Sequence, residues 1–574
     1  MKKERICTLF AFTVLIAVCS YPLFINLGKL SLRMWDESRN AINAFEMMKD
    51  HSFIVTHFDG QPDTWNSKPP FMIWCIALCM KLFGATTFAV RLPSALATLA
   101  AVVLLFGMSK KYLSNVLPGF LAALVLCSSV GFIDYHVARN GDFDAMLSVW
   151  MFFYALFFFL YLEVKERKKL VWSAVFLALA ILTKGIAACM ILPALLFFVF
   201  TGKEYRSVLK KPEFYIIPSL GLLAGLSYYL IREGLNAGYI KAVIENEITG
   251  RYMATNEGHT GSFFYYLQLM NEAHYRIWLR VLPFAFIAVF FSKEKREKQL
   301  SIFSMFVCVC YLLIISCAQT KLPWYDAPLY PFMALIIGIG AKTVYAILLS
   351  YTPLKAFPER TIGFCFFCLL LFYYPSKNIL ASSLRAKKET YYPELFYGDF
   401  ISSFHKKFPA AGLLTVVSEG YNPHLIFYTK TYRDKGLSIT VVPRNAAFKI
   451  NDTVMVCEPD KMWPVSGITR YADTIYSEDN NKFVLKINDP GQKETQMAAS
   501  EKLFYGQIDD IKANEEWMKD ILGKAAKKGN DPEKQVQLDA LYKLETGKLL
   551  SKGAADSLRI KFRLTESQPA APQQ

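Results

Sequence analysis

Long stretches of this chain lack charged residues, although Lys, Arg, Asp and Glu make up 20% of its 574 residues. Apolar blocks of about 20 residues, the length that crosses a bilayer as a helix, recur from Ile6 to about Tyr374. These blocks and a mean hydropathy of +0.26 exclude an ordinary soluble protein. The later sequence has a soluble composition. The sequence therefore predicts a polytopic α-helical membrane domain at 1–378 and an aqueous domain at 379–574.

Cysteine is nearly lacking in the aqueous domain, where Cys457 is the single thiol, so no disulfide can form within that domain. A clear small-x-small cleavage site is lacking after the first apolar run, which therefore predicts an uncleaved span with its basic end inside. The net charge of +16 lies in short Lys/Arg clusters between apolar blocks. That pattern indicates membrane orientation and needs no nucleic-acid partner.

The basic loops also set the number of spans. Placing all of them on the inner side with the N-terminus requires eleven spans, with thirteen as the upper bound. The run at 69–85 is short and flanked by a proline pair and Gly84, so we expect it to lie in the interface. The predicted spans are 6–27, 91–109, 116–134, 144–163, 170–184, 186–201, 213–232, 276–292, 300–317, 326–350 and 361–376. The segments 28–90, 135–143, 183–185, 233–275, 318–326 and the aqueous domain then lie outside.

The first outer loop opens with an amphipathic pattern. In "DESRNAINAFEMMKD", Asp36, Arg39, Asn43 and Glu46 recur at helical spacing opposite apolar residues, which predicts a helix along the membrane surface. Asp36 suits an N-cap, with Arg39 as a solvated partner. It equally suits a carboxylate held at the membrane edge as a general base.

Further charged residues gather in the other outer segments. Lys184 lies between two apolar runs and must reach water, an anion or a carboxylate. His136 is interpreted as a polar loop residue, with metal ligation left open. The mixed charge and glycines of 233–275 are typical of a partly ordered lid. The site candidates are Arg39, Lys68, Arg139, Asp142, Asp144, Lys184, Glu247, Arg251, His259, Lys321 and Tyr325.

These lysines, arginines and carboxylates meet at one membrane face, which suits an enzyme acting on a lipid phosphate. A transporter would bury ionisable groups near mid-bilayer, often within internal repeats. The predicted spans are nearly free of charge and show no repeat. The sequence therefore favours the enzyme.

Four ordered motifs carry a family resemblance. They are Asp-Glu-x-Arg at Asp36–Arg39, Lys-Pro-Pro at Lys68–Pro70, Leu-Phe-Gly at Leu82–Gly84 and Arg-Leu-Pro-Ser at Arg91–Ser94. "ARNGDFDAML", "LTKG", "ENEITGR" and "TKLPWYDAPLYP" follow in the family's order. Residues 1–376 thus resemble bacterial polyprenyl-phosphate-sugar glycosyltransferases of the C type (GT-C), akin to protein O-mannosyltransferases and the lipid A aminoarabinose transferase.

The resemblance implies an inverting transfer of sugar from a polyprenyl-phosphate donor at the periplasmic face of the bacterial inner membrane. The acceptor would be lipid A, another envelope glycan or a protein. Asp36 would be the base or acceptor-orienting carboxylate, ranked ahead of Glu37. Lys68 would hold the donor phosphate, helped by Arg251, Lys321 and Tyr325. The alternative is a polyprenyl-linked glycan ligase or a lipid-phosphate carrier without sugar-transfer chemistry.

The chain departs from this family at one position that concerns a metal. Lipid A transferase relatives have Glu before the lysine, where it helps bind a metal, and a later His that pairs with it. This chain has Ser67 and Asn246 instead. We therefore expect no metal site of that kind; a divalent cation is the one cofactor left open.

In the aqueous domain "AGLLTVVSEGYNPHLIFYTK" indicates a strand, a loop and a helix, and "LSITVV", "DTVMVCEP" and "KFVLKI" indicate further strands. From about 507 to 563 the sequence is charged and helical. These patterns predict a small α/β domain with a helical C-terminal segment. No catalytic constellation is evident in it, so we expect acceptor binding or a cover over the site.

Overall fold

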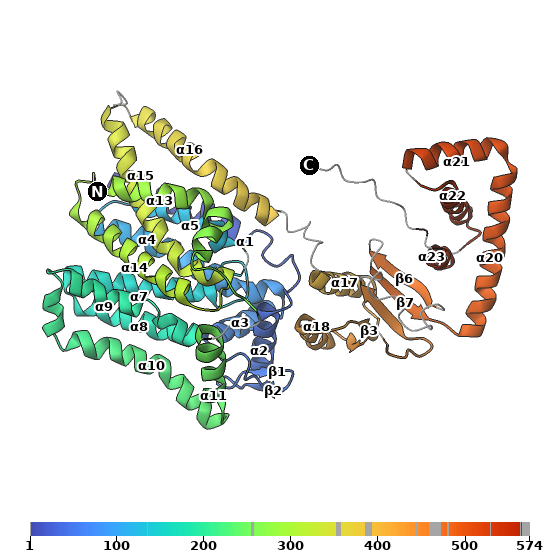
Figure 1. Ribbon diagram of the computed structural model, residues 1–574, viewed down its shortest axis with the longest axis horizontal. Helices are drawn as coiled ribbons and strands as arrows, with labels where there is room; N and C mark the ends of the chain where they lie inside the picture. The colour runs from blue at the N-terminus through green and yellow to red at the C-terminus, as the bar shows by residue number, and fades with distance from the viewer. Residues whose placement is uncertain are drawn as a thin grey trace. The chain divides into compact units, whose positions relative to one another are not determined.

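The computed structural model describes residues 2–134, 136–253, 258–351, 357–384, 393–443, 445–457, 472–478, 482–528, 530–550, 552–562 and 564. The chain forms two compact units, residues 1–389 and 390–574 (Figure 1). The predicted domain end at residue 378 falls inside the helix α16 (Phe357–Leu384). This helix continues into polar sequence because apolar length, which guided the prediction, does not determine where a helix ends.

The first unit is almost entirely helical. Its long helices are α1 (Lys2–Phe24), α4 (Thr87–Tyr112), α7 (Asp144–Val164), α8 (Arg167–Lys184), α10 (Glu213–Leu235), α14 (Lys295–Cys317) and α15 (Tyr330–Tyr351). Within the described residues, seven segments are long and apolar enough to cross a membrane, with α8 extended to Cys189 and α15 extended from Pro323. The chain is therefore a polytopic helical membrane protein.

The shorter helices of this unit lie between the long ones. They are α2 (Asp36–Asp50), α3 (Phe71–Phe83), α5 (Leu117–Cys127), α6 (Val130–Ile133), α9 (Leu192–Thr201), α11 (Tyr239–Val243), α12 (Tyr265–Leu269) and α13 (Arg276–Val289). 3-10 turns occur at η1 (Gly185–Cys189), η2 (Arg206–Lys210) and η5 (Pro323–Leu329), and π-helical turns at η3 (Ile244–Met253) and η4 (Met270–His274).

Each predicted span coincides with a helix, but some are interrupted. The span expected at 116–134 ends as a helix at Cys127, where the Ser128 and Ser129 hydroxyls donate to the carbonyls of Leu124 and Val125. The span expected at 186–201 begins with the turn η1, and Gly185 takes a φ of +59° at that bend. The sequence predictions overestimated the length of these two helices because they followed apolar composition, which continues through the turns.

Two glycines allow α15 to pack closely. A Cβ at Gly338 would lie 2.4 Å from the carbonyl oxygen of Pro118 at the start of α5. A Cβ at Gly340 would lie 2.4 Å from the carbonyl oxygen of Ala285 in α13. Small residues let helix backbones approach in this way within membranes. α15 is consequently wedged between α5 and α13, with its first half buried.

The first outer loop folds against the unit. α2 is followed by the hairpin β1 (His57–Phe58) and β2 (Gln61–Pro62), and then by α3. The α2 helix buries ten of its fifteen residues, including Asn40 and Asn43. Its polar side therefore contacts protein rather than water. Asp36 is the first helical residue and Trp35 precedes it without a side-chain cap, so the N-cap interpretation of Asp36 is wrong.

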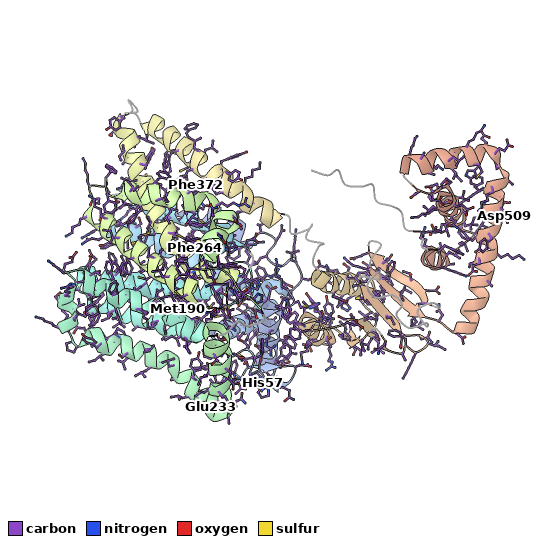
Figure 2. All side chains as sticks on the ribbon, viewed as in Figure 1. His57, Met190, Glu233, Phe264, Phe372 and Asp509 are labelled. Carbon is purple, nitrogen blue, oxygen red and sulfur yellow. The ribbon has the colours of Figure 1, made fainter. Side chains whose placement is uncertain are left out.

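The junction between this loop and α10 is held by a buried arginine. The Arg232 guanidinium donates to the carbonyl of Ile54 (3.2 Å), the hydroxyl of Thr56 (3.1 Å) and the carbonyl of Asp63 (3.2 Å). Figure 2 labels His57 and Glu233, the residues that follow Thr56 and Arg232 in the chain. The end of a membrane helix thereby fixes the loop that carries the candidate residues.

Membrane orientation gives a first prediction. If every basic loop lies inside, a reporter fused at Lys295 reports the cytoplasm and one fused at Gly258 reports the outer side. Paired phosphatase and fluorescent-protein fusions at both positions measure this. A report of the same side from both positions contradicts the eleven-span topology.

The second unit contains a five-stranded mixed sheet in the order β4-β3-β5-β7-β6. β3 (Leu413–Val417) pairs in parallel with β4 (Ser438–Val442) and with β5 (Thr453–Cys457). β7 (Lys482–Ile487) pairs antiparallel with β5, and β6 (Ala472–Glu478) pairs antiparallel with β7. The four predicted strands are present. The sequence analysis missed β6, whose burial does not alternate cleanly along "ADTIYSE".

Helices complete this unit. α17 (Pro393–Lys407) and α18 (Pro423–Arg433) accompany the sheet, and α20 (Pro490–Ala513), α21 (Glu515–Lys528), α22 (Pro532–Thr546) and α23 (Lys552–Lys561) follow it (Figure 1). The last four helices enclose a separate core that includes Phe504, Ile511, Ile521 and Leu541. The predicted α/β domain with a helical C-terminal segment is what the structure contains.

Candidate functional site

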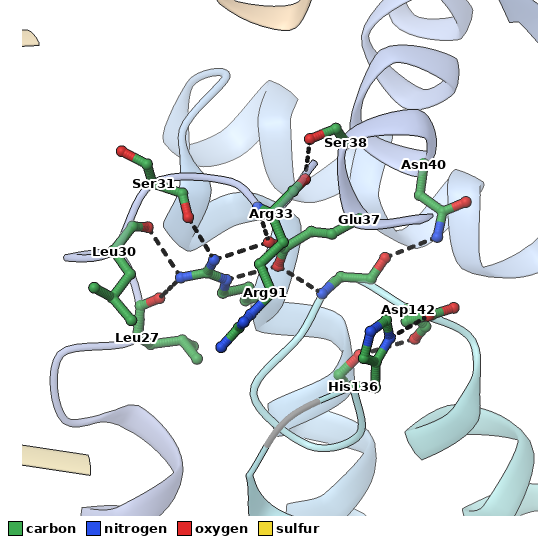
Figure 3. A network of polar contacts seen from close by, with 12 residues as sticks. Leu27, Leu30, Ser31, Arg33, Glu37, Ser38, Asn40, Arg91, His136 and Asp142 are labelled. Carbon is green, nitrogen blue, oxygen red and sulfur yellow. Dashed lines mark hydrogen bonds and ion pairs between the residues drawn. The ribbon is translucent and has the colours of Figure 1, made fainter. Parts of the chain in front are cut away.

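Glu37, the second residue of α2, forms a buried ion pair with Arg91 of α4 (Figure 3). Arg91 Nε lies 2.6 Å from Oε1 and a terminal nitrogen lies 2.8 Å from Oε2. The backbone N–H groups of Arg33 and Gly141 also donate to this carboxylate. Burial acts to raise the pKa of Glu37, but the Arg91 charge and hydrogen bonds hold it below its usual value.

Arg91 also binds the segment that connects α1 to α2. Its guanidinium donates to the carbonyls of Leu27, Leu30 and Ser31 (Figure 3). The pair therefore joins the end of α1, the start of α2, α4 and the 141 loop. A carboxylate whose two oxygens are both hydrogen-bonded in this way forms a structural ion pair and is not available as a base.

A second polar network fixes the other side of α2. Asp63 forms a bidentate pair with Arg39, at 2.8 and 2.7 Å, and accepts a hydrogen bond from Asn43. Asn66 donates to Asn43 at 2.8 Å. Burial acts to raise the pKa of Asp63, but the hydrogen bonds and charge of Arg39 hold it below its usual value. Arg39 is thus a structural partner and not the solvated one that the sequence suggested.

Three possible metal ligands meet beside this network. One ligand atom from each of Asp36, His136 and Asp142 lies within 4.8 Å of the others. His136 Nδ1 is 3.1 Å from an Asp142 oxygen, and the imidazole stacks on Trp324 with ring centroids 3.8 Å apart. Burial acts to raise the pKa of Asp142, but the His136 hydrogen bond and the Lys184 charge hold it well below its usual range. Two carboxylates and an imidazole are a set that can hold a divalent cation.

Below this group, Lys184 of α8 is buried against Asp144, the first residue of α7. Its Nζ lies 2.6 and 2.7 Å from the two carboxylate oxygens. The ring of Tyr325 lies 5.4 Å from the same Nζ. Of the three partners that the sequence allowed for Lys184, the structure provides a carboxylate.

Lys68 lies at the end of the turn before α3. Its Nζ is 3.7 Å from Glu247 of η3 and 5.6 Å from the ring centroid of Phe143, the residue after Asp142. The Ser67 hydroxyl donates to the same Glu247 carboxylate at 2.7 Å. Glu247 therefore links the predicted lid segment to the Lys-Pro-Pro turn.

Two predicted site cations instead bind helix ends. Lys321 Nζ donates to the carbonyls of Ile315, Ser316 and Ala318 at the end of α14, and burial lowers its pKa. Arg139 donates to the carbonyls of Pro22, Leu23 and Ile25 at the end of α1. Unpaired carbonyls at a helix C-terminus attract cations in this way.

The remaining predicted residues are placed less directly. His259 lies in an exposed segment, and its carbonyl accepts the backbone N–H of Lys321. The side chain of Arg251 lies outside the described residues. The structure therefore brings together Asp36, Lys68, Asp142, Asp144, Lys184, Glu247 and Tyr325 around residues 142–143.

Sequence reasoning missed a polar group that forms around Asp326. Asp326 lies 2.9 Å from His274 Nδ1 and 2.5 Å from the Tyr330 hydroxyl. His274 is distant in sequence and belongs to no motif that the sequence analysis singled out. Asp326 and Tyr330 lie one helical turn apart within the motif "TKLPWYDAPLYP", but nothing in the sequence joined them to His274.

Comparison with known proteins shows what the chain is similar to. The family model for dolichyl-phosphate-mannose-protein mannosyltransferase matches residues 67–231. An undecaprenyl phosphate-alpha-4-amino-4-deoxy-L-arabinose arabinosyl transferase 2 of Pseudomonas fluorescens is 25% identical over 335 residues, which cover 57% of this chain and 59% of that protein. An uncharacterized protein of Aquifex aeolicus is 27% identical over 322 residues, covering 54% and 60%.

The fold has a counterpart among solved structures. The crystal structure of ArnT from Cupriavidus metallidurans bound to undecaprenyl phosphate has a TM-score of 0.60 at 15% identity, covering 83% of this chain and 97% of that one. In sequence and in fold the chain is similar to polyprenyl-phosphate-sugar glycosyltransferases of the GT-C type.

The chain matches only about 60% of the length of the curated relatives. The likeness in sequence is confined to somewhat more than half of the chain, whereas the likeness in fold extends over 83% of it. At 15% identity, the likeness to the solved structure shows the fold alone. The substrates of this chain must be argued from its own site.

Proposed function

We propose that this chain transfers a sugar from a polyprenyl-phosphate donor to an acceptor at the outer face of a bacterial inner membrane. One observation supports this most strongly: a carboxylate, Asp36, and a cation, Lys68, flank the same loop at residues 142–143. The carboxylate can accept a proton from an attacking hydroxyl, and the cation can stabilise a departing phosphate. The relatives named as arabinosyl transferases act with undecaprenyl phosphate by name, which agrees with a lipid-linked donor.

In the proposed reaction the acceptor oxygen attacks the anomeric carbon of the sugar. The bond from that carbon to the donor phosphate oxygen breaks, and configuration inverts. Asp36 takes the acceptor proton, while Lys68 pairs with the phosphate as its charge develops. Glu37, which the sequence ranked as a second catalytic candidate, is assigned to positioning because Arg91 occupies both of its oxygens.

Lys321 and Arg139 are likewise assigned to holding helix ends, and Tyr325 to the wall beside Lys184. The acceptor class remains lipid A, another glycan or a protein. The competing proposal is a ligase or carrier for lipid-linked glycan. Mass spectrometry of envelope glycolipids and glycoproteins from a deletion strain decides between them. Loss of one sugar modification, restored by the wild-type gene, supports transfer, and an unchanged sugar inventory overturns it.

The donor-phosphate role of Lys68 gives a second prediction. Lys68→Met removes a charge-assisted contact worth about 1.5–3 kcal/mol, so we expect the KM for the lipid-phosphate donor to rise about ten- to a hundredfold. Glu247→Gln should lower that KM, because its carboxylate competes for Lys68. Initial rates at varied donor concentration in proteoliposomes measure both effects.

The matched control is Lys81→Met, an exposed lysine in the last turn of α3. It should leave the KM unchanged. Equal donor KM values for Lys68→Met and wild type would contradict the phosphate assignment. A lower kcat with unchanged KM would indicate that Lys68 acts only after the donor has bound.

A further inference from the structure

We propose that Tyr239, a buried tyrosine of α11, is a positioning residue that determines where the Lys68 ammonium meets the donor phosphate. This role deepens the proposed function and rests on it for the part that Lys68 plays. The contact between Tyr239 and the turn before α3 stands independently of any substrate. Tyr239 lies outside the ordered motifs of the sequence.

The Tyr239 hydroxyl binds the backbone directly before Lys68. It donates to the carbonyl of Ser67 at 2.6 Å, and both residues are buried. That carbonyl and the backbone N–H of Lys68 belong to one peptide group, which is planar. A hydrogen bond that fixes the direction of the carbonyl therefore also fixes the nitrogen from which Lys68 begins.

Prolines restrict the backbone on the other side of Lys68. Pro69 and Pro70 follow it, and a residue before proline is largely confined to extended backbone conformations. The ring of each proline also fixes its own φ. Covalent structure thus restrains the lysine from its C-terminal side, and the Tyr239 hydroxyl supplies the restraint from its N-terminal side.

Tyr239 can hold this turn because its own ring is held in place. The ring stacks on that of Tyr229, with centroids 6.0 Å apart and an interplanar angle of 21°. The Arg232 guanidinium lies 4.7 Å from the Tyr239 ring centroid and also donates to the carbonyl of Asp63. Two residues at the end of α10 therefore fix the tyrosine, and one of them binds the same loop four residues before Ser67.

The tyrosine cluster also packs beside the second buried lysine of the site. A Cβ at Gly185, the residue after Lys184, would collide with the Tyr229 hydroxyl and would lie 3.6 Å from the Pro69 ring. The glycine thus allows Tyr229 and Pro69 to pack closely against the end of α8. The Lys-Pro-Pro turn consequently has little room to shift toward α8.

Glu247 contacts the same turn, but in a different way. Its carboxylate accepts a hydrogen bond from the Ser67 hydroxyl and pairs with Lys68 Nζ at 3.7 Å. A donor phosphate would compete with that carboxylate for the ammonium. Tyr239 binds a backbone carbonyl and does not compete, so its contact is retained when the donor binds. Its loss should therefore weaken donor binding and leave the chemical step nearly unchanged.

Removal of one hydroxyl tests this role. Tyr239→Phe keeps the ring and its packing but leaves the Ser67 carbonyl without its donor, so we expect the affinity for a lipid phosphate to fall about three- to tenfold. Undecaprenyl phosphate is the probe, titrated into the full-length protein in nanodiscs, with binding measured by native mass spectrometry. In proteoliposomes the donor KM should rise by the same factor, with kcat unchanged.

Two comparisons make the result specific to Lys68. Tyr154→Phe is the matched control, because the buried Tyr154 hydroxyl donates to another buried carbonyl, that of Ala188, at 2.7 Å. This variant should bind the probe as wild type does. In a Lys68→Met background, Tyr239→Phe should cause no further loss, since the side chain that it positions no longer carries a charge.

The outcomes separate this role from the proposed function. Wild-type affinity in Tyr239→Phe, an equal loss in Tyr154→Phe, or a full further loss in the Lys68→Met background overturns the positioning role. Undiminished probe binding by Lys68→Met overturns it together with the phosphate role of Lys68. The expected binding pattern in a chain that transfers no sugar supports the positioning role and overturns only the proposed function. Sugar transfer with an unchanged donor KM in Tyr239→Phe overturns the positioning role alone.

Discussion

Asp36→Asn is expected to lower the rate of sugar transfer about 10²- to 10⁴-fold, the range that a general base contributes. Asparagine keeps the size of the side chain but cannot accept the acceptor's proton at neutral pH. Asp36 is also the partly exposed member of its cluster, while Asp142 is buried and bonded to His136. It is therefore the carboxylate that an acceptor can reach. Initial rates with lipid-linked donor in proteoliposomes measure the loss.

Two comparisons make this result specific. Asp50→Asn alters a carboxylate at the opposite end of α2 and should retain the wild-type rate. His136→Gln removes the imidazole beside Asp142 but leaves the Asp36 carboxylate, so its rate should lie between those of wild type and Asp36→Asn. Transfer by Asp36→Asn at the wild-type rate would exclude Asp36 as the base. An equal and complete loss in both site variants would instead assign Asp36 to metal binding alone.

The choice between Asp36 and Glu37 shows what sequence can and cannot supply. The two residues are adjacent, and both belong to the Asp-Glu-x-Arg motif. On a helix, consecutive side chains point about 100° apart, so only one of them can face a given neighbour. Which one faces the site depends on Arg91, which lies 54 residues away in the sequence. No local pattern contains that information.

The positive residues show a related limit. Topology brought Lys68, Lys184, Lys321 and Arg139 to one face of the membrane, and the sequence treated them alike. The structure distinguishes them by what each one contacts. Lys321 and Arg139 bind terminal carbonyls of α14 and α1. Lys184 binds Asp144, whereas Lys68 pairs with Glu247 on the segment interpreted as a lid. A lysine bound to a helix end and a lysine that awaits a phosphate look alike in the sequence, because each is a single cation beside an apolar run.

Apolar length and strand alternation, by contrast, were sufficient for the architecture. Both patterns depend on residues that are near one another in the chain. Burial in a membrane or against a sheet requires apolar residues at regular positions along the whole element. Helix ends inside the membrane were predicted less well. The breaks after Cys127 and before Leu192 arise from serine hydroxyls and a glycine bend within apolar sequence.

The Glu37–Arg91 pair carries the other large prediction, and its effect is on stability. Arg91→Met should lower the free energy of unfolding by about 3–5 kcal/mol, because it leaves a buried carboxylate without its counter-charge. It also leaves the carbonyls of Leu27, Leu30 and Ser31 without their donor. Thermal unfolding of the protein in detergent, followed by size-exclusion chromatography, measures the change.

The double variant Glu37→Gln/Arg91→Met separates charge from packing. If the buried charge is the main cost, the double variant should be more stable than Arg91→Met alone, since no isolated carboxylate remains. An exposed ion pair supplies the control: Lys241→Met, which breaks the exposed contact with Glu245, should change stability by less than about 1 kcal/mol. Equal losses from Arg91→Met and Lys241→Met would show that the pair does not hold α2 to α4. In that case Glu37 would return as a catalytic candidate, because the contact that excludes it would carry no energy.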